Sequence, residues 1–111
     1  MKKREFPYYI LNGKEPVGTN DITEWGKCME GKRHVGNNHI FGIHISTVFL
    51  GTDHGWNSDV PILFETMVFG GYYDEYQWRY ATWKEAEKGH RKILLKVIHT
   101  LPWSLLRMTK D

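Results

Sequence analysis

Two segments in the middle of the chain combine a period-of-two alternation with β-branched and aromatic residues, which is typical of half-buried β-strands. They run from about Ile40 to Thr52 and from Pro61 to Gly70, and the polar stretch DHGWNSDV separates them. A third extended run lies near Gln77 to Ala81. Because short connections join antiparallel neighbours, the pattern predicts a three-stranded antiparallel meander.

A helical period follows these strands. Thr82 and Glu85 form the Thr-x-x-Glu pattern of a capping box, so a helix should begin at Trp83. It should end near His99, before Pro102. The positions that recur every three or four residues and predict its buried face are Trp83, Ala86, His90, Ile93, Leu94, Val97 and Ile98.

The first forty residues predict two further elements. The stretch REFPYYIL closes at the turn pair Asn12–Gly13 and predicts a short strand. Pro7 either places this strand at a sheet edge or delays its start. Asp21 followed by Glu24 predicts the start of a short helix that Gly31 ends. The stretch HVGNNHI, residues 34–40, is expected to be a loop, because asparagines tolerate turn conformations.

Together these elements predict an α+β fold in the order strand, helix, three strands, helix. An antiparallel sheet of three to four strands should carry the long C-terminal helix on one face. The tail WSLLRMTKD is expected to dock through Trp103, Leu105 and Leu106. A length of 111 residues suits a single domain over residues 1–111.

Alternation divides the central strands into two faces. One set is nearly all apolar and is assigned to the core beneath the long helix: Ile43, Ile45, Thr47, Phe49, Ile62, Phe64, Thr66 and Val68. The opposite set is mixed: His44, Ser46, Val48, Leu50, Leu63, Glu65, Met67 and Phe69, with Trp78 and Tyr80 assigned to the same face. Apolar walls with a few polar groups are typical of a ligand surface or a subunit interface.

Glu65 places a carboxylate in an apolar strand, next to His44 and Ser46 of the neighbouring strand on this register. An unpaired buried carboxylate is costly or takes up a proton, so it needs a partner. Two interpretations stay open. Glu65 either pairs with a cation or lies at an exposed surface, with Lys84 or Arg79 as the cation if the register differs by one residue, or it accepts hydrogen bonds from a ligand.

Asp53 and His54 open the loop between the central strands, where side chains either hold a turn or bind a ligand. The spacing of His44, His54 and Glu65 matches no metal motif, so no metal ligand is predicted. The chain shows no catalytic constellation and no Gly-rich phosphate loop, and no cofactor is expected. His90 is expected to be a hydrogen-bonded core residue.

Composition adds limits on the class of protein. The chain is 41% apolar, 14% aromatic and 25% charged, which suits a globular chain with its own core. The single cysteine, Cys28, excludes an internal disulfide and fits the cytoplasm. No apolar run has the length of a membrane span, so neither secretion nor membrane spanning is expected.

The formal net charge of +2 is too small to imply a nucleic-acid surface by itself. Basic residues nevertheless gather at three places. These clusters are Lys2 to Arg4, Lys32 to His34, and the set Arg91, Lys92 and Lys96. Each is either a solvated face or a patch for anionic ligands.

Three segments, STVFLGTDH, PILFETMVFGG and RYATWKEAEKGH, resemble motifs of a family of small bacteriophage and prophage proteins. Typical members have STVFLGLDH, PLLFETMVFGG and RYSTWEEAEAGH there, and Thr52 replaces the usual Leu. The resemblance covers roughly residues 43 to 99 and implies a viral source without assigning a reaction. Residues that match its motifs are Asp53, His54, Glu65, Gly70, Gly71, Trp83, Glu85 and His90.

Three functions fit these observations. The first is a non-enzymatic binder acting in the host cytoplasm, which sequesters a nucleotide immune signal or blocks a host defence protein. Rings of Trp56, Trp78 or Tyr80 would stack on a base while Arg79 or Arg91 lies near the phosphates. The second is a phage structural, assembly or DNA-transaction accessory protein, and the third is a small metal-assisted hydrolase.

The predicted ligand-binding residues are His44, Asp53, His54, Trp56, Glu65, Trp78, Arg79 and Tyr80. A homodimer or higher oligomer is also expected, because a sheet covered by helices on one face leaves the His44 side open to association.

Overall fold

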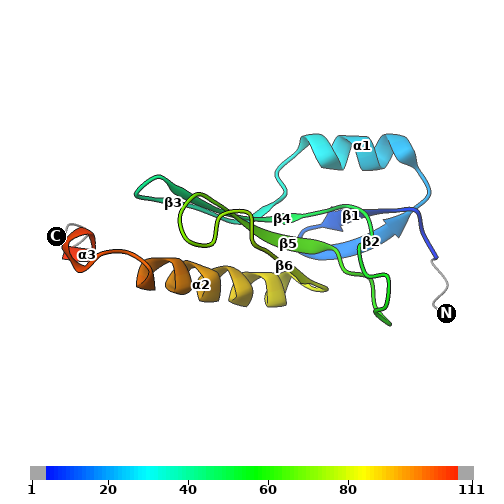
Figure 1. The fold of residues 1–111 in the computed structure, drawn as a ribbon. Coiled ribbons are helices and arrows are strands. Elements are labelled where there is room, and N and C mark those ends of the chain that lie inside the picture. The colour runs from blue at the N-terminus through cyan, green and yellow to red at the C-terminus, as the bar shows by residue number, and fades with distance from the viewer. Residues whose placement is uncertain (1–4, 108–111) are drawn as a thin grey trace.

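A four-stranded antiparallel sheet and one long helix form two layers at the centre of the fold (Figure 1). The computed structural model describes residues 5–107. The strands lie in the order β3 (His34–Ile40), β4 (Ile43–Phe49), β5 (Phe64–Phe69) and β6 (Gln77–Tyr80), and α2 (Trp83–His99) packs on one face. This arrangement confirms the predicted α+β class with a long C-terminal helix on an antiparallel sheet.

The capping box sets the start of α2 as predicted. The Thr82 hydroxyl accepts a hydrogen bond from the Glu85 backbone N–H at 3.1 Å, and the Glu85 carboxylate accepts one from the Thr82 backbone N–H at 3.1 Å. Both bonds satisfy backbone donors that have no partner inside the helix. The helix ends at His99, so both predicted bounds are confirmed.

The core lies between α2 and one face of the sheet. Along β4 and β5, buried residues alternate with half-buried or exposed ones, as the period of two predicts. The buried members from the strands are Ile43, Ile45, Thr47, Phe49, Phe64, Thr66 and Val68, and those from α2 are Ala86, His90, Ile93 and Val97. Ile62, also assigned to the core, precedes β5 and is half-buried.

The segment expected to be a loop at residues 34–40 is instead the edge strand β3, and that prediction was wrong. Ile40 pairs with Ile43 through a two-residue turn in which Phe41 and Gly42 both have positive φ, 46° and 79°. Such a turn matches the twist of the strands that it joins. The strand expected from about Ile40 to Thr52 therefore begins at Ile43, after this turn, and β3 becomes the fourth strand of the sheet.

A separate hairpin precedes the sheet. It consists of β1 (Tyr8–Asn12) and β2 (Glu15–Thr19), which pair with each other in a two-stranded sheet. The sequence EPVGT has few strand formers, so β2 was not predicted. At Gly18 a Cβ would lie 2.1 Å from the Phe6 ring, so glycine is what allows that ring to lie on the strand.

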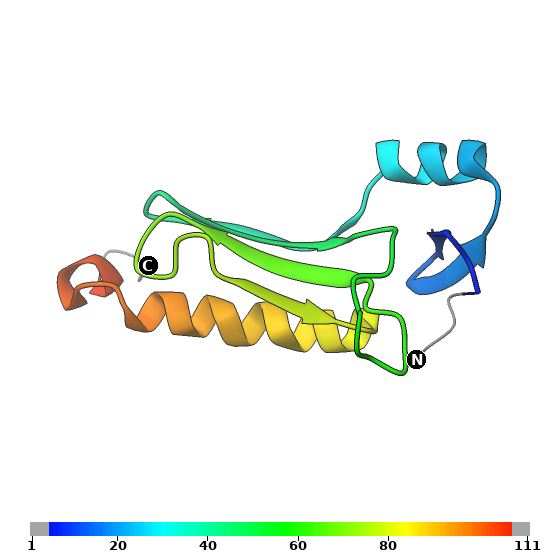
Figure 2. The same cartoon turned by 45° about the vertical axis from the view of Figure 1, so that its right-hand side comes forward.

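The helix α1 (Ile22–Glu30) lies beside this hairpin, at one end of the sheet (Figure 2). The Asp21 carboxylate accepts hydrogen bonds from Thr23 and Glu24, as the N-cap pattern predicted. The indole of Trp25 donates to the Gly51 carbonyl at 3.0 Å. Because the Tyr9 backbone N–H donates to the same carbonyl at 2.9 Å, Gly51 joins both N-terminal elements to the end of β4.

The C-terminal segment forms the short helix α3 (Trp103–Arg107). Trp103 is 73% exposed, so the expected docking through this residue was wrong, whereas Leu105 is half-buried. The side chain of Leu106 and the basic cluster at residues 2–4 lie outside the described part of the chain. The molecule is elongated, with extents of 51, 30 and 20 Å.

No helix within residues 5–107 has the length and apolar character needed to cross a membrane.

Candidate functional site

The face of the sheet opposite α2, here called the open face, is the surface on which three of the predicted site residues lie. Figures 1 and 2 show α2 on the other side and α1 displaced toward the hairpin. Cross-strand neighbours on this face are His39 with His44, His44 with Phe69, Ser46 with Met67, Val48 with Glu65, and Glu65 with Arg79. All of these side chains are at least partly exposed.

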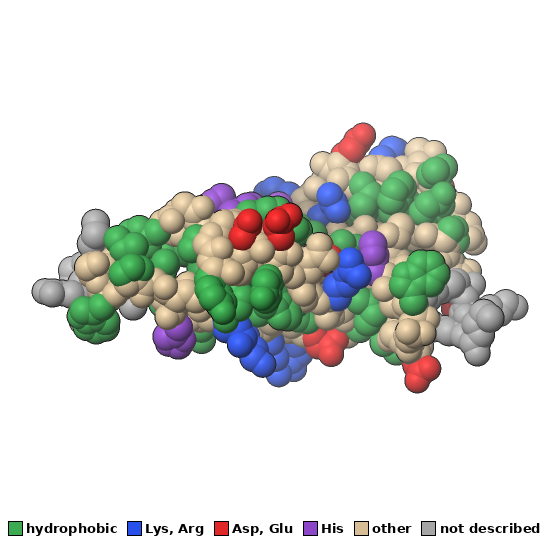
Figure 3. Space-filling model, viewed as in Figure 1, with side chains coloured by type: hydrophobic (Ala, Val, Ile, Leu, Met, Phe, Trp, Pro, Cys, Tyr) green, Lys and Arg blue, Asp and Glu red, His purple; other side chains and the backbone are tan. Residues whose placement is uncertain are grey.

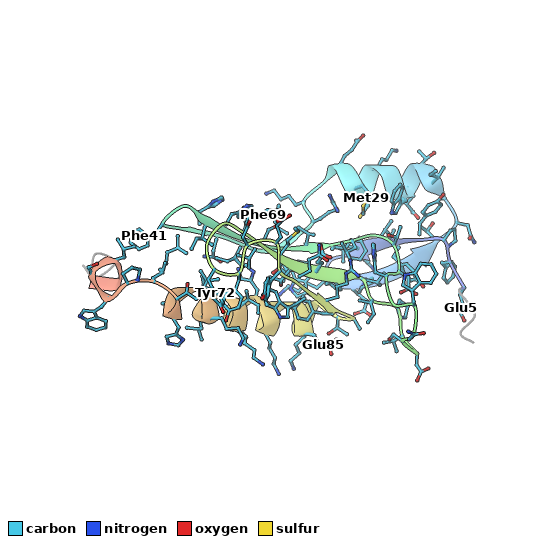
Figure 4. All side chains as sticks on the ribbon, in the orientation of Figure 1. Glu5, Met29, Phe41, Phe69, Tyr72 and Glu85 are labelled. Atoms are coloured by element: carbon cyan, nitrogen blue, oxygen red, sulfur yellow. The ribbon has the colours of Figure 1, made fainter. Side chains whose placement is uncertain are left out.

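Three rings form a row across this face. The His39 and His44 rings stack with centroids 4.1 Å apart and planes 8° apart, and the Phe69 ring lies 5.5 Å from His44 at 28°. The row crosses β3, β4 and β5 in turn, and Phe69 is 43% exposed. Figure 4 shows Phe69 on the side of the sheet away from α2. The row is therefore a stack of rings that reaches solvent, with the outer faces of His39 and Phe69 at its two ends.

His44 is held in place by its neighbours. Its Nε2 atom is hydrogen-bonded to the Asn37 side-chain oxygen, and because that oxygen only accepts, Nε2 carries the proton. Partial burial lowers the pKa of His44, and the nearby His39 and His34 lower it further. His44 is thus a neutral ring near pH 7, suited to stacking.

Glu65 has a partner within the protein. Its carboxylate accepts a hydrogen bond from Arg79 Nε at 3.0 Å, and the two residues are directly opposite in the ladder. The side chain of Glu65 is 15% exposed and that of Arg79 is 43% exposed. Of the two interpretations, the cation pair is the one present here. The residue opposite Glu65 on β4 is Val48. The expected position of Glu65 beside His44 and Ser46 is therefore not the one in the structure, where these two residues are opposite Phe69 and Met67.

Trp78 and Tyr80 lie on the core face, and their assignment to the open face was wrong. Trp78 is opposite Thr66 and Tyr80 is opposite Phe64, and directly paired residues share a face. The length of the connection between β5 and β6 decides this register. The assignment of Leu63 to the open face was also wrong, because Leu63 precedes β5 and is buried with Phe49 and Phe64.

The core face carries its own polar chain. Tyr80 donates to the Thr66 hydroxyl at 3.0 Å, and that hydroxyl is hydrogen-bonded to Thr47. His90 Nδ1 lies 2.7 Å from the Thr47 hydroxyl, and Nε2 lies 2.6 Å from the Asn38 side-chain oxygen.

Since the Asn38 oxygen only accepts, His90 Nε2 donates, and Nδ1 of the neutral ring accepts from Thr47. Burial lowers the pKa of His90, which keeps the ring neutral, and it raises the pKa of Tyr80. The expectation of a hydrogen-bonded core histidine is confirmed.

The loop between β4 and β5 holds the other predicted residues. One oxygen of Asp53 accepts from the backbone N–H of Gly55 at 2.8 Å and of Ile62 at 3.0 Å. His54 Nε2 lies 3.1 Å from the Thr52 hydroxyl. These bonds are those of a structural turn. Trp56 is 86% exposed and belongs to this loop, outside the strands that form the open face.

Sequence reasoning missed Asn37 and His39, because β3 was expected to be a loop. The signal was the pair Ile40 and Ile43 around a two-residue turn that contains glycine, which is a hairpin pattern. Within residues 5–107, no group of three or more His, Cys, Asp or Glu side chains is placed to hold a metal ion.

Two adjoining grooves lie where the β1–β2 hairpin meets the start of α2. Their volumes are about 380 and 260 Å³, and Glu15, Pro16 and Thr82 line both. Lys14 Nζ lies 5.8 Å from the centre of the Trp83 ring in the larger groove. None of the eight predicted site residues lines either groove, so the sequence did not indicate this hollow.

Comparison of this chain with protein-family models, with curated proteins and with solved structures finds no match.

Proposed function

We propose that this protein is a non-enzymatic binding protein whose open face receives a ligand with a planar ring, such as the base of a nucleotide. The observation that supports this proposal is the exposed row of His39, His44 and Phe69. Stacking of a base on an aromatic ring contributes about 1–3 kcal/mol and needs no particular base. The outer faces of His39 and Phe69, at the two ends of the row, are the ones on which a base would stack, while the neutral His44 ring between them holds the row together.

Arg79, at the other end of this face, would bind a phosphate of the ligand. Its Nε is bonded to Glu65, which leaves the remaining guanidinium N–H groups free of this bond for an anion. Phe69 and Glu65 are four residues apart on β5, or about 13 Å at the usual rise of a strand. A ligand that uses both ends of the face should therefore have the size of a dinucleotide, linear or cyclic.

Calorimetric titration with linear and cyclic mono- and dinucleotides tests this proposal. Dinucleotides should bind more tightly, and Phe69→Ala should weaken binding by about 1–3 kcal/mol. Trp56→Ala is the matched control, since it removes an exposed ring from the β4–β5 loop, outside the strands that form the open face. Absence of binding at high micromolar nucleotide, or an equal loss in both variants, would refute the proposal.

The resemblance to bacteriophage proteins supports a role in the host cytoplasm, where the protein would sequester a nucleotide signal or block a host defence protein. A sequestering protein returns its ligand unchanged. Chromatography of the nucleotide released after denaturation should show the intact compound, and a hydrolysed product would favour the metal-assisted hydrolase instead.

The open face would also suit a second copy of the chain. Phe69 and Met67 are apolar and lie on a face that no helix covers, so a homodimer through this face would bury them. Light scattering should then give twice the monomer mass of 13.1 kDa, and nucleotide should shift the protein toward the monomer. A monomer at high protein concentration without nucleotide would exclude the dimer.

A further inference from the structure

The outward side of α2 is a ridge of basic side chains. The buried positions Ala86, His90, Ile93 and Val97 face the sheet, and the exposed positions on the other side are rich in lysine. The members of this ridge, here called the basic ridge, are Lys84, Lys88, Arg91, Lys92 and Lys96. Lysines four residues apart are separated by about 6 Å along the axis, a spacing close to that of neighbouring phosphates in a nucleic-acid strand.

The acids of α2, Glu85 and Glu87, lie near the N-terminal end of the basic ridge. From Lys88 to Arg107 the chain contains no Asp or Glu. Within the described residues, no carboxylate lies within ion-pair distance of Lys88, Arg91 or Lys92. Like charges that repel along a helix cost free energy, and the opposite charge of a bound polyanion offsets that cost. Binding also releases the counterions of the polyanion, which favours the complex.

Exposed aromatic rings stand beside the basic ridge. Tyr72 is 75% exposed and Tyr76 is 53% exposed, both in the connection between β5 and β6. Between them Tyr73 packs on the core cluster to which α2 contributes Ile93. Figure 4 places Tyr72 on the α2 side of this connection, and Figure 3 shows basic atoms directly below the exposed hydrophobic rings at the middle of the face.

This connection is held in one shape. Gly70, Gly71 and Glu75 have positive φ values of 94°, 74° and 69°, and a residue other than glycine adopts such a conformation only at a cost. The Glu75 backbone N–H donates to the Val68 carbonyl at 2.7 Å, and the Asp74 carboxylate accepts from the Gly70 N–H at 2.6 Å. The backbone that carries the rings is thus ordered before binding, which lowers the entropic cost of ordering the loop on binding.

We propose that the basic ridge, together with Tyr72 and Tyr76, binds single-stranded nucleic acid, with phosphates on the cations and bases stacked on the tyrosines. A cationic track beside stacking rings is the general form of such surfaces. An anionic membrane is disfavoured, because Leu95 is the exposed large apolar side chain of α2 and a membrane helix buries a whole apolar face. The surface lies on the opposite side of the sheet from the open face, and the inference does not depend on the function proposed there.

Fluorescence anisotropy with labelled oligothymidine and with a duplex of equal length tests this assignment at several salt concentrations. The double variant Lys88→Gln/Lys92→Gln should reduce the slope of log affinity against log salt by about 1.4, since each phosphate contact on a single strand contributes about 0.7. Tyr72→Ala should weaken binding of the single strand by about 5- to 150-fold and leave the salt slope unchanged.

The matched control is Lys27→Gln/Lys32→Gln, which removes the same charge from exposed positions on and just after α1. An equal effect of the control would show a response to net charge and overturn the proposal. Duplex binding as tight as single-strand binding, or binding to anionic lipid vesicles without binding to oligothymidine, would also overturn it. All three variants should leave nucleotide binding at the open face unchanged, so failure here is distinct from failure there.

Discussion

The two faces of the central sheet are built from alternate residues of the same strands, yet their polar groups differ in burial and in hydrogen-bond partners. On the core face, Thr47 and Thr66 are completely buried, and each is part of a hydrogen-bonded chain. On the open face, Glu65 and Arg79 form a pair that solvent still reaches. A polar group that has lost water must have a protein partner, whereas a polar group at the surface can exchange partners with a ligand.

Two histidines show the difference most clearly. His90 uses both ring nitrogens inside the protein and is 6% exposed. His44 uses one nitrogen, with Asn37, and its ring is stacked between His39 and Phe69 at the surface. His90 is therefore a core residue, whereas His44 belongs to a partly exposed row of rings.

Replacing each histidine by alanine should give the largest difference in the free energy of unfolding between the two faces. His90→Ala removes a buried ring and leaves Thr47 without an acceptor, so the free energy of unfolding should fall by about 2–4 kcal/mol. His44→Ala should change it by about 0.5 kcal/mol or less. Urea denaturation of both variants measures the difference, and similar losses would contradict the assignment of the two faces.

A one-residue shift along β3 should give the next largest contrast. A Cβ at Gly36 would lie 2.6 Å from the His90 ring, so Gly36→Ala should destabilise the fold by about 1–3 kcal/mol through overpacking. Asn37 faces the other side, and Asn37→Ala should cost about 0.5 kcal/mol or less. The melting temperatures of the two variants provide the comparison, and an unchanged Gly36→Ala protein would show that His90 packs elsewhere.

The pH dependence of stability should sharpen the same contrast. Burial lowers the pKa of His90 below the value of about 6.5 expected when the chain is unfolded, so the unfolded state binds more protons. Stability is therefore complete above pH 6.5 and is lost as the pH falls toward the lower pKa of the folded state. One such proton contributes a slope of at most about 1.4 kcal/mol per pH unit.

Denaturation at several pH values between 5 and 7.5, where the carboxylates stay ionised, measures this slope. His90→Gln should flatten it more than His44→Ala does. If both variants keep the full slope of the original protein, another group is responsible.

The smallest effect should come from Glu65→Gln. The ion pair with Arg79 is partly exposed, and such pairs contribute about 0–1 kcal/mol. Nucleotide affinity should not fall, because the carboxylate is already occupied by Arg79. A variant that melts like the original protein but binds nucleotide more weakly would show that Glu65 itself contacts the ligand.

The elements that could be predicted from the sequence are those marked by residues close together in the chain. Thr82 and Glu85 are three residues apart, so their capping box could be recognised without any tertiary information, and α2 begins and ends where predicted. The alternation within β4 and β5 likewise separated the buried residues from the partly exposed ones, because successive side chains in a strand point to opposite faces. The helical period likewise placed His90 in the core, because residues three or four apart lie on the same face of a helix.

The contacts between residues of neighbouring strands depend on how the strands pair in the folded protein. The partner of Glu65 lies 14 residues further along the chain, and the length and shape of the connection at residues 70–76 determine that Arg79 rather than Trp78 is opposite. The strand β3 has few strand-forming residues and is stabilised by pairing with β4, so its local sequence resembled a loop. The ring row exists because that pairing brings His39 onto His44, a contact that depends on register and that no single segment specifies.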